Sequence, residues 1–344
     1  MRYCHIPIFV PHRGCPHNCV FCNQHVITGA DDTVRAADVT RLVTQHLETI
    51  RPGQTHIEAA FFGGSFTGID GALQEELLGA AYVFLADGRI DGIRCSTRPD
   101  YIDGLVLERL KRYGVSMVEL GVQSTDEAVL YLSGRGHGRQ AVLKAAAAIQ
   151  AAGISLGLQM MVGLPGDTAE KSVQTARDLI SLRPDCVRIY PALVLPGTTL
   201  YNWYLTGEYT PLTVEEAVEQ CAVLLAMFQQ AGIPVIRVGL QTTDGVNAET
   251  AIGPYHPALR ELAKGRLFRS ALEKAVKRGF AKSGELVVWV RPQDVSCAVG
   301  HKRENACYLL RQYGVRLKVF RDISVDDGNL TVAFQNERHL LPIG

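Results

Sequence analysis

Three cysteines close together near the start of the chain have the residue type and spacing that could do chemistry. Cys15, Cys19 and Cys22 follow the pattern C-x3-C-x2-C within RGCPHNCVFCNQ (13–24). Iron–sulfur clusters are held by cysteine thiolates, usually four for a cubane cluster, so three would leave one iron without a cysteine from this loop. A metal with an open coordination position is generally a working metal that binds substrate or cofactor. The spacing therefore favours an open iron–sulfur site.

Two other interpretations of the cysteine loop stay open at this point. A structural zinc site needs four ligands, and His12, His17 or His25 could supply the fourth. Structural or redox-active thiols without a metal are the other possibility. The chain has nine cysteines, an odd number, and the six outside the loop are scattered singly, which argues against a disulfide framework.

Composition sets broad limits on the class of protein. The 344 residues carry a formal net charge of zero, which gives no global electrostatic argument for binding nucleic acid or a membrane. No apolar run approaches the roughly 20 residues of a membrane span. The first residues are interrupted by prolines and do not resemble a signal peptide. We expect a cytoplasmic protein with no membrane partner.

The elements that must position the cysteines alternate regularly along the chain. Near-continuous apolar runs predict strands over 6–12, 55–64, 93–99, 116–124, 155–166, 186–197 and 234–241. Helical periodicity between them predicts helices over 34–50, 71–88, 102–114, 139–153, 169–182 and 213–232. This alternation is typical of an α/β fold with a parallel sheet, and so many successive units suggest a partial or full (β/α) barrel. An open doubly wound sheet is the structural alternative.

The unusual residues follow the predicted strands, as the cysteine loop and GGSFTG both do. The loops after the strands hold the chemistry of a barrel, so this agreement favours the barrel. From about residue 245 the pattern changes to a helix within 253–279, strands near 285–292, 315–322 and 329–335, and a segment at 305–314. We therefore predict a barrel domain over 1–244 and a small α+β extension over 245–344.

The cysteine loop resembles the signature of the radical S-adenosylmethionine (radical SAM) superfamily. The segments FFGGSFTG, STRPDYID, ELGVQSTDEAVLYLSGRGH, GLQMMVGLPGDT and VRIYPALVLPGT extend the similarity over roughly residues 5–240 to the radical SAM core of the Elongator family. The resemblance implies that the three thiolates hold three irons of a [4Fe-4S] cluster and that SAM chelates the fourth. The reduced cluster would then cleave SAM to methionine and a 5′-deoxyadenosyl radical. An electron donor such as flavodoxin or ferredoxin is the implied partner, and a tRNA nucleoside is the family-level substrate.

The same resemblance assigns residues at the strand ends to SAM. An aromatic residue between the second and third cysteines would contact the adenine, the glycine-rich loop would receive the amino group, and an arginine would pair with the carboxylate. Polar side chains in apolar strands cost stability unless they are paired, and ribose hydroxyls could pair them, as could an internal polar network. The predicted SAM-binding residues are Phe21, Gly63, Gly64, Ser65, Thr67, Ser96, Gln123, Arg135, Met161, Gly163 and Tyr190. Further catalytic or substrate-binding candidates are Arg98, Glu119, His137, Tyr255 and His256.

The match to the Elongator family departs in two places. That enzyme carries a C-terminal acetyltransferase domain, and we expect this chain to lack it, because no Gly-rich acyl-CoA loop follows the predicted barrel. We likewise expect no counterpart of the basic N-terminal tRNA-binding arm. An anaerobic oxidase or methyltransferase acting on a small molecule such as a porphyrin is therefore the alternative enzyme. A non-catalytic iron–sulfur or zinc-binding carrier protein is the alternative outside enzymes.

Overall fold

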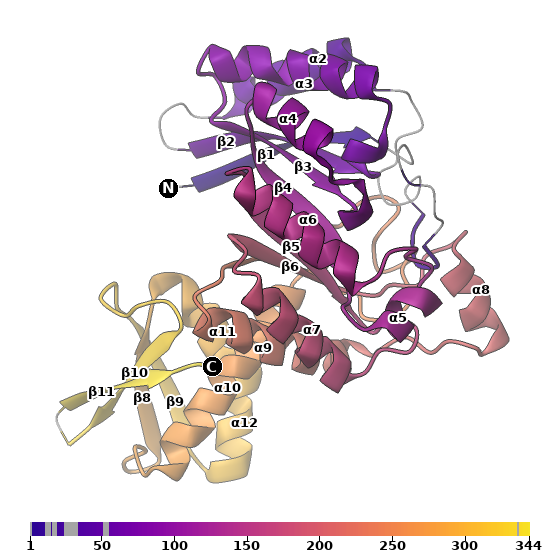
Figure 1. Ribbon diagram of the computed structural model, residues 1–344. Helices are drawn as coiled ribbons and strands as arrows, with labels where there is room; N and C mark the ends of the chain where they lie inside the picture. Colours follow the sequence, from indigo (N-terminus) through magenta and orange to yellow (C-terminus); the bar gives the residue numbers. More distant parts are fainter. Residues whose placement is uncertain (1, 11–14, 16–18, 24–33, 51–54, 336) are drawn as a thin grey trace.

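The computed structural model describes residues 2–10, 15, 19–23, 34–50, 55–335 and 337–344. Its strands form two sheets, and each sheet has its own buried apolar cluster (Figure 1). No helix in these ranges is long and apolar enough to cross a membrane.

The larger sheet contains seven parallel strands arranged in the order in which they occur along the chain. A doubly wound sheet would reverse its strand order at one point, and this sheet does not. Figure 1 shows the sheet curled, with helices along its outer side. The sheet is therefore a partial (β/α) barrel, which confirms the predicted fold class. Its strands are β1 (Arg2–Val10), β2 (Thr55–Gly63), β3 (Gly92–Thr97), β4 (Val115–Gln123), β5 (Ser155–Val162), β6 (Cys186–Pro191) and β7 (Val235–Val238).

The helices between these strands begin and end at residues that satisfy their terminal backbone groups. The Asp70 carboxylate accepts from the amides of Ala72 and Leu73 at the start of one helix, and Thr213 forms a capping box with Glu216 at the start of another. All six predicted helices are present, with slightly shorter ranges. They are α2 (Ala36–Thr49), α3 (Gly71–Ala86), α4 (Gly104–Arg112), α6 (Arg139–Ala151), α7 (Ala169–Ser181) and α9 (Val214–Gln230), with two short unpredicted helices, α5 (Glu127–Leu132) and α8 (Thr199–Thr206).

The predicted strands over 155–166, 186–197 and 234–241 are all shorter in the structure, where they form β5, β6 and β7. β5 ends before Gly163, whose φ of +75° turns the chain away from the sheet. β6 ends at Pro191, and beyond it Val194 makes an isolated antiparallel bridge with Ile252. Apolar residues continue past the ends of β5 and β6 because the loops there are also buried.

The smaller sheet has four strands in the order β11, β10, β8 and β9. β8 and β9 are parallel, while β10 runs antiparallel to β8 and to β11, so this unit is the predicted α+β type. The last strand was not predicted. The elements are β8 (Glu285–Val290), α11 (Val295–Val299), α12 (Glu304–Tyr313), β9 (Arg316–Arg321), β10 (Asn329–Phe334) and β11 (Glu337–Pro342).

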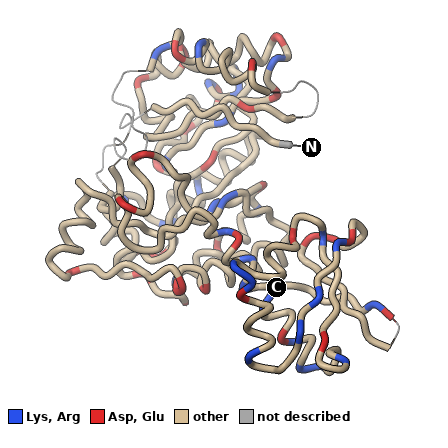
Figure 2. The backbone as a smooth tube through the Cα atoms, turned by 180° about the vertical axis from the view of Figure 1, so that it is seen from behind, with Lys and Arg blue, Asp and Glu red and all other residues tan. Residues whose placement is uncertain are grey.

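One long helix, α10 (Leu259–Lys277), packs against both apolar clusters. Leu259, Ala263 and Leu267 belong to the core of the larger sheet. Phe268, the next residue, and Leu272, about one turn further on, belong to the core of the smaller sheet. Figure 2 shows Lys and Arg interspersed with Asp and Glu in both parts of the chain.

Candidate active site

The three cysteines line one small cavity of about 140 Å³ at the carboxyl ends of the first strands. Backbone hydrogen bonds anchor the second half of their loop, because the Val20 amide donates to Ser133 and the Val20 carbonyl accepts from Leu200. Among the described residues, no three His, Cys, Asp or Glu side chains lie close enough to hold a single metal ion. A cluster spreads its ligands over separate irons. The histidines of the zinc alternative lie outside the described residues.

Two buried arginines flank the cysteines. The Arg135 Nη1 donates to the Cys19 Sγ at 3.2 Å, and its Nη2 donates to the Gly121 carbonyl. Arg98 forms a bidentate pair with Asp100, at 2.9 and 2.8 Å, and also donates to the Arg135 carbonyl. Burial raises the pKa of the Cys15 thiol, although both guanidinium groups oppose that shift. The cavity can therefore stabilise several thiolates once a metal replaces their protons.

Two of the guanidinium nitrogens beside the cysteines have no partner. The Arg135 Nε and the Arg98 Nη1 are buried without a hydrogen bond in the described structure, and so is the Gln123 Oε1. Native proteins rarely leave such groups unpaired unless a ligand, ion or water completes them. An anionic cluster and the polar groups of SAM are ligands that would complete them, so the residues present fit both cofactors.

The glycine-rich loop after β2 approaches β1 closely. Gly63 has φ +109°, and a Cβ there would lie 3.0 Å from the Val10 carbonyl oxygen. The Gly64 amide donates to the same oxygen at 2.9 Å. These contacts place the backbone of the loop at the wall of the cysteine cavity, which Gly63, Gly64 and Ser65 line.

A chain of hydroxyl groups holds the glycine-rich loop against the end of β3. The Thr67 hydroxyl donates to the Tyr101 carbonyl at 2.7 Å, so it accepts from the Thr97 hydroxyl at 2.6 Å. Thr97 in turn accepts from Ser65 at 2.7 Å. The Thr67 hydroxyl therefore forms hydrogen bonds that position the loop, and Thr67 does not line the cavity.

The end of β4 is strained at Gln123, which has φ +71°. Residues other than glycine rarely adopt this backbone conformation, and it occurs mostly where surrounding structure enforces it near functional sites. The register between β4 and β5 is irregular between Gly121 and Gln123. This bulge turns Gln123 into the cysteine cavity, which Ser96 and Gln159 also line.

A second cavity of about 730 Å³ follows the concave face of the sheet and joins the first. Phe21, Cys22 and Gly63 line both cavities, as do Ser96 and Gln123. The larger cavity extends past Met161 and Tyr190 to β7 and to the loop that follows it. The space beside the cysteines therefore opens directly into a compartment large enough for a second molecule.

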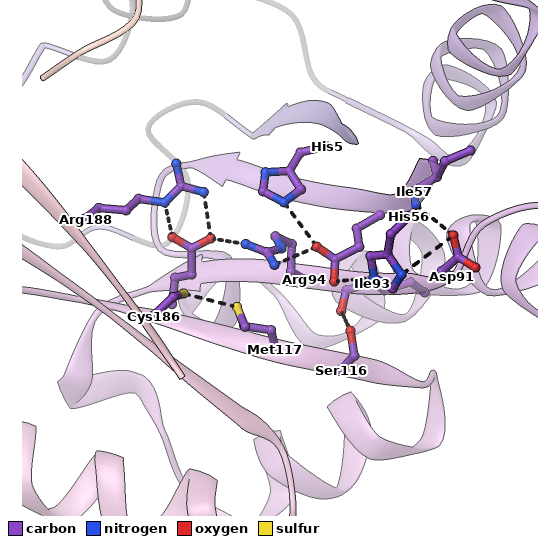
Figure 3. A network of polar contacts seen from close by, with 12 residues as sticks. His5, His56, Ile57, Asp91, Ile93, Arg94, Ser116, Met117, Cys186 and Arg188 are labelled. Atoms are coloured by element: carbon purple, nitrogen blue, oxygen red, sulfur yellow. Dashed lines mark hydrogen bonds and ion pairs between the residues drawn. The ribbon is translucent and has the colours of Figure 1, made fainter. Parts of the chain in front are cut away.

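A chain of alternating charges lies beside this compartment, and its members His5 and Arg188 line the cavity (Figure 3). Glu58 pairs with His5 at 3.2 Å and with Arg94 at 2.6 Å. Arg94 also pairs with Glu119 at 2.9 Å, and Arg188 makes a bidentate pair with the same carboxylate, at 2.5 and 2.9 Å. Burial would raise the pKa of Glu119, but Arg188 and Arg94 outweigh it and hold that pKa below its ordinary value.

The remaining candidates lie away from the two cavities. Glu119 is inside the charge chain, and the Gly163 carbonyl accepts from the Tyr209 hydroxyl. His137 is buried behind Arg135, and burial together with the two arginines lowers its pKa to about 4. Tyr255 packs behind the wall of the larger cavity and bonds Thr242, and His256 contacts His301 in the second unit. Their assigned roles stay predictions.

Most of the polar side chains on the concave face were not predicted from the sequence. His5, Arg94, Gln159, Arg188 and Arg237 each interrupt an apolar strand singly. Their shared signal is a charged or amide residue at an inward position of a buried strand, which is costly unless it is paired. The partners of these side chains are on strands far apart in the sequence, so a single polar residue in an apolar strand does not reveal its partner.

Two family models match this chain. The Radical SAM superfamily model matches residues 9–179, and the Radical_SAM C-terminal domain model matches residues 184–269. The relative named tRNA uridine(34) acetyltransferase from Methanocaldococcus infernus is 36% identical over 126 residues, 36% of this chain and 24% of that protein. Human Elongator complex protein 3 is 32% identical over 179 residues, 51% of this chain and 32% of that protein. The chain thus matches about a quarter to a third of the length of these relatives.

The fold has a counterpart among solved structures. The archaeal Methanocaldococcus infernus Elp3 with an N-terminal deletion superposes with a TM-score of 0.58 at 19% identity, over 96% of this chain and 73% of that one. A similarity at this level of identity concerns the fold alone. The family models and the sequence relatives show that the chain belongs to the radical SAM superfamily, as an enzyme related to the Elongator proteins that uses a [4Fe-4S] cluster and SAM.

Proposed function

We propose that this enzyme abstracts a hydrogen atom from a nucleoside in RNA, with tRNA uridine as the first candidate. When bound, the cluster and SAM supply the reactive 5′-deoxyadenosyl radical. The observation that carries the proposal is the continuity of the two cavities, which share lining residues from Phe21 to Gln159. A substrate in the larger cavity would therefore lie next to the cofactors. The relatives named for tRNA uridine(34) support the substrate class.

The residues of the chain have distinct tasks in this proposal. Cys15, Cys19 and Cys22 hold the cluster, and Arg135 donates to one of those sulfurs. The glycine-rich loop presents backbone groups to SAM at a place where a side chain would collide with β1. Apolar residues such as Phe9, Phe62 and Leu193 form part of the lining of the larger cavity and would limit the access of water to a radical.

Three further assignments belong to the proposal. Ser96, Gln123, Met161 and Tyr190 contact SAM or substrate, because all four line the larger cavity. A flavodoxin or ferredoxin supplies the electron. Residues 1–244 form the catalytic domain and 245–344 the extension, with α10 packing against both.

The test uses the protein reconstituted with iron and sulfide without oxygen. Dithionite and SAM are added and 5′-deoxyadenosine is measured, with Cys19→Ala as the variant that cannot complete the cluster. Transfer RNA transcribed with deuterated uridine is then supplied. Deuterium in the 5′-deoxyadenosine from wild type alone supports the proposal. Cleavage of SAM without deuterium transfer would reject uridine and favour another substrate, such as a small molecule. Zinc bound in place of a cluster would reject the radical chemistry.

A further inference from the structure

The larger cavity has an imbalance of charge. Its described lining includes two arginines, Arg188 and Arg237, and two histidines, His5 and His46, but no aspartate or glutamate. The whole chain has equal numbers of acidic and basic residues, so this composition is local. A compartment lined by one sign of charge between apolar walls concentrates ligands of the opposite sign.

The charge chain beside the cavity does not remove the imbalance. Glu58 and Glu119 are matched by two cations, Arg94 and Arg188, which contact them directly. Arg188 is therefore already compensated. The Arg237 side chain has neither a hydrogen bond nor an ion pair within the described ranges of the chain, although it is only part-exposed and lines the cavity. It is the surplus charge of this face.

The position of Arg237 next to a second arginine makes its uncompensated positive charge more unfavourable. Arg237 on β7 and Arg188 on β6 are register partners in neighbouring parallel strands. Adjacent strands are about 4.8 Å apart, so the two arginines are neighbours on one face. Like charges side by side are unfavourable unless an anion lies between them.

Tyr190 adds a neutral donor to the same place. It is two residues after Arg188 on β6, and alternation along a strand puts it on the same face. Burial raises the pKa of the Tyr190 hydroxyl, so it keeps its proton at neutral pH and can donate it. Aromatic rings from Phe9 and Phe62 form the apolar part of the lining.

We infer that the larger cavity binds an anionic oxygen group of the substrate, a phosphate or a carboxylate, through Arg237 with Tyr190 beside it. This inference rests on the proposed function, because it assigns a substrate class to the same compartment. The planar guanidinium can pair two oxygens of either group at once. A nucleotide phosphate and the carboxylate of a small molecule share this chemistry, and the experiment separates them.

The experiment measures binding by calorimetry to the reconstituted protein with SAM and without a reductant. The phosphate arm compares uridine 5′-monophosphate with uridine, and the carboxylate arm compares succinate with succinamide. In at least one arm, the wild-type protein should bind the anionic probe roughly tenfold or more tightly than the neutral one, because one charged hydrogen-bonded pair contributes about that much. Arg237→Gln should reduce that preference to about threefold or less. Arg177→Gln, which removes an exposed arginine from the outer helix α7, should leave it unchanged.

A second measurement needs no variant. The preference of the wild-type protein for the anion should shrink as sodium chloride is raised, because the interaction is between charges. Equal binding of both members in both arms would overturn the inference, and so would no binding of any probe up to about 10 mM. A preference that survives Arg237→Gln, or that does not respond to salt, would also overturn it.

The binding test and the activity test can fail separately. No reductant is present, so the preference for an anion can be found even when RNA is not the substrate. Conversely, deuterium transfer from RNA together with equal binding of charged and neutral probes would overturn only the role of Arg237.

Discussion

Replacing Glu119 with glutamine should destabilise the fold strongly, although the two side chains have nearly the same shape. Glu119 is 1% exposed, and its oxygens accept from Arg188 at 2.5 and 2.9 Å, from Arg94 at 2.9 Å and from Gln159 at 3.2 Å. Glutamine offers one acceptor oxygen and turns an NH2 group toward the donors on the other side.

The expected loss of stability depends on which carboxylate partner each arginine keeps after the substitution. Arg94 still pairs with Glu58 after the change, whereas Arg188 loses the only carboxylate that it contacts in the described structure. Removing one partner of a buried ion pair costs about 3–5 kcal/mol, because the remaining charge is buried without compensation. At roughly 2 °C per kcal/mol for a unit of this size, the melting temperature should fall by about 6–10 °C.

The matched control is Glu285→Gln, which breaks a pair with Lys318 at the surface. Its side chains are 36% and 52% exposed, so this pair contributes at most about 1 kcal/mol. Both variants and the wild-type protein are melted side by side and followed by circular dichroism. A fall of less than about 2 °C for Glu119→Gln, or one equal to the control, would refute the idea that this carboxylate compensates Arg188.

Two further predictions concern the cysteine cavity. Gly63→Ala places a Cβ 3.0 Å from the Val10 carbonyl oxygen at φ +109°, so it should cost about 1–3 kcal/mol and weaken SAM binding, as measured by melting and calorimetry. Gly88→Ala, at φ +67° with open space around it, is the control that should leave SAM binding intact. The pKa of His137 falls from 6.5 to about 4 in the fold because of burial and its two arginines, so the unfolded chain binds the proton first as pH drops. Stability without cofactor should therefore decline from about pH 6.5 toward 4, by about 2 kcal/mol at pH 5, and an unchanged slope in His137→Phe would contradict this cause.

The predictions from sequence succeeded where local patterns carry the information. Seven buried strands and the helices between them follow from runs and periodicities within about 20 residues. The glycines after β2 and the cysteine spacing are equally local, and these residues line one cavity as the barrel topology requires. The short helices α5 and α8 were missed because six or eight residues give too few turns for a periodic signal.

The concave face could not be predicted in the same way. Its charge chain joins β1, β2, β3, β4 and β6, so each pair depends on strand order and register rather than on neighbouring residues. The backbone strain at Gln123 arises from a bulge between two strands and leaves no trace in the local sequence. Arg135 was predicted from the family resemblance. The structure places its side chain against the Cys19 sulfur.

The helix α10 packs in both cores, and this determines how easily the two units can be separated. A chain cut after residue 244 would remove Leu259, Ala263 and Leu267 from the larger core, and each buried leucine contributes about 1.5–3 kcal/mol. The proposed boundary at residue 244 is therefore followed by a helix that both cores share. Calorimetry should show one cooperative transition for the whole chain, and two resolved transitions would show that the halves are independent. Because of this shared helix, the second unit cannot be gained or lost as an interchangeable module without repacking the first.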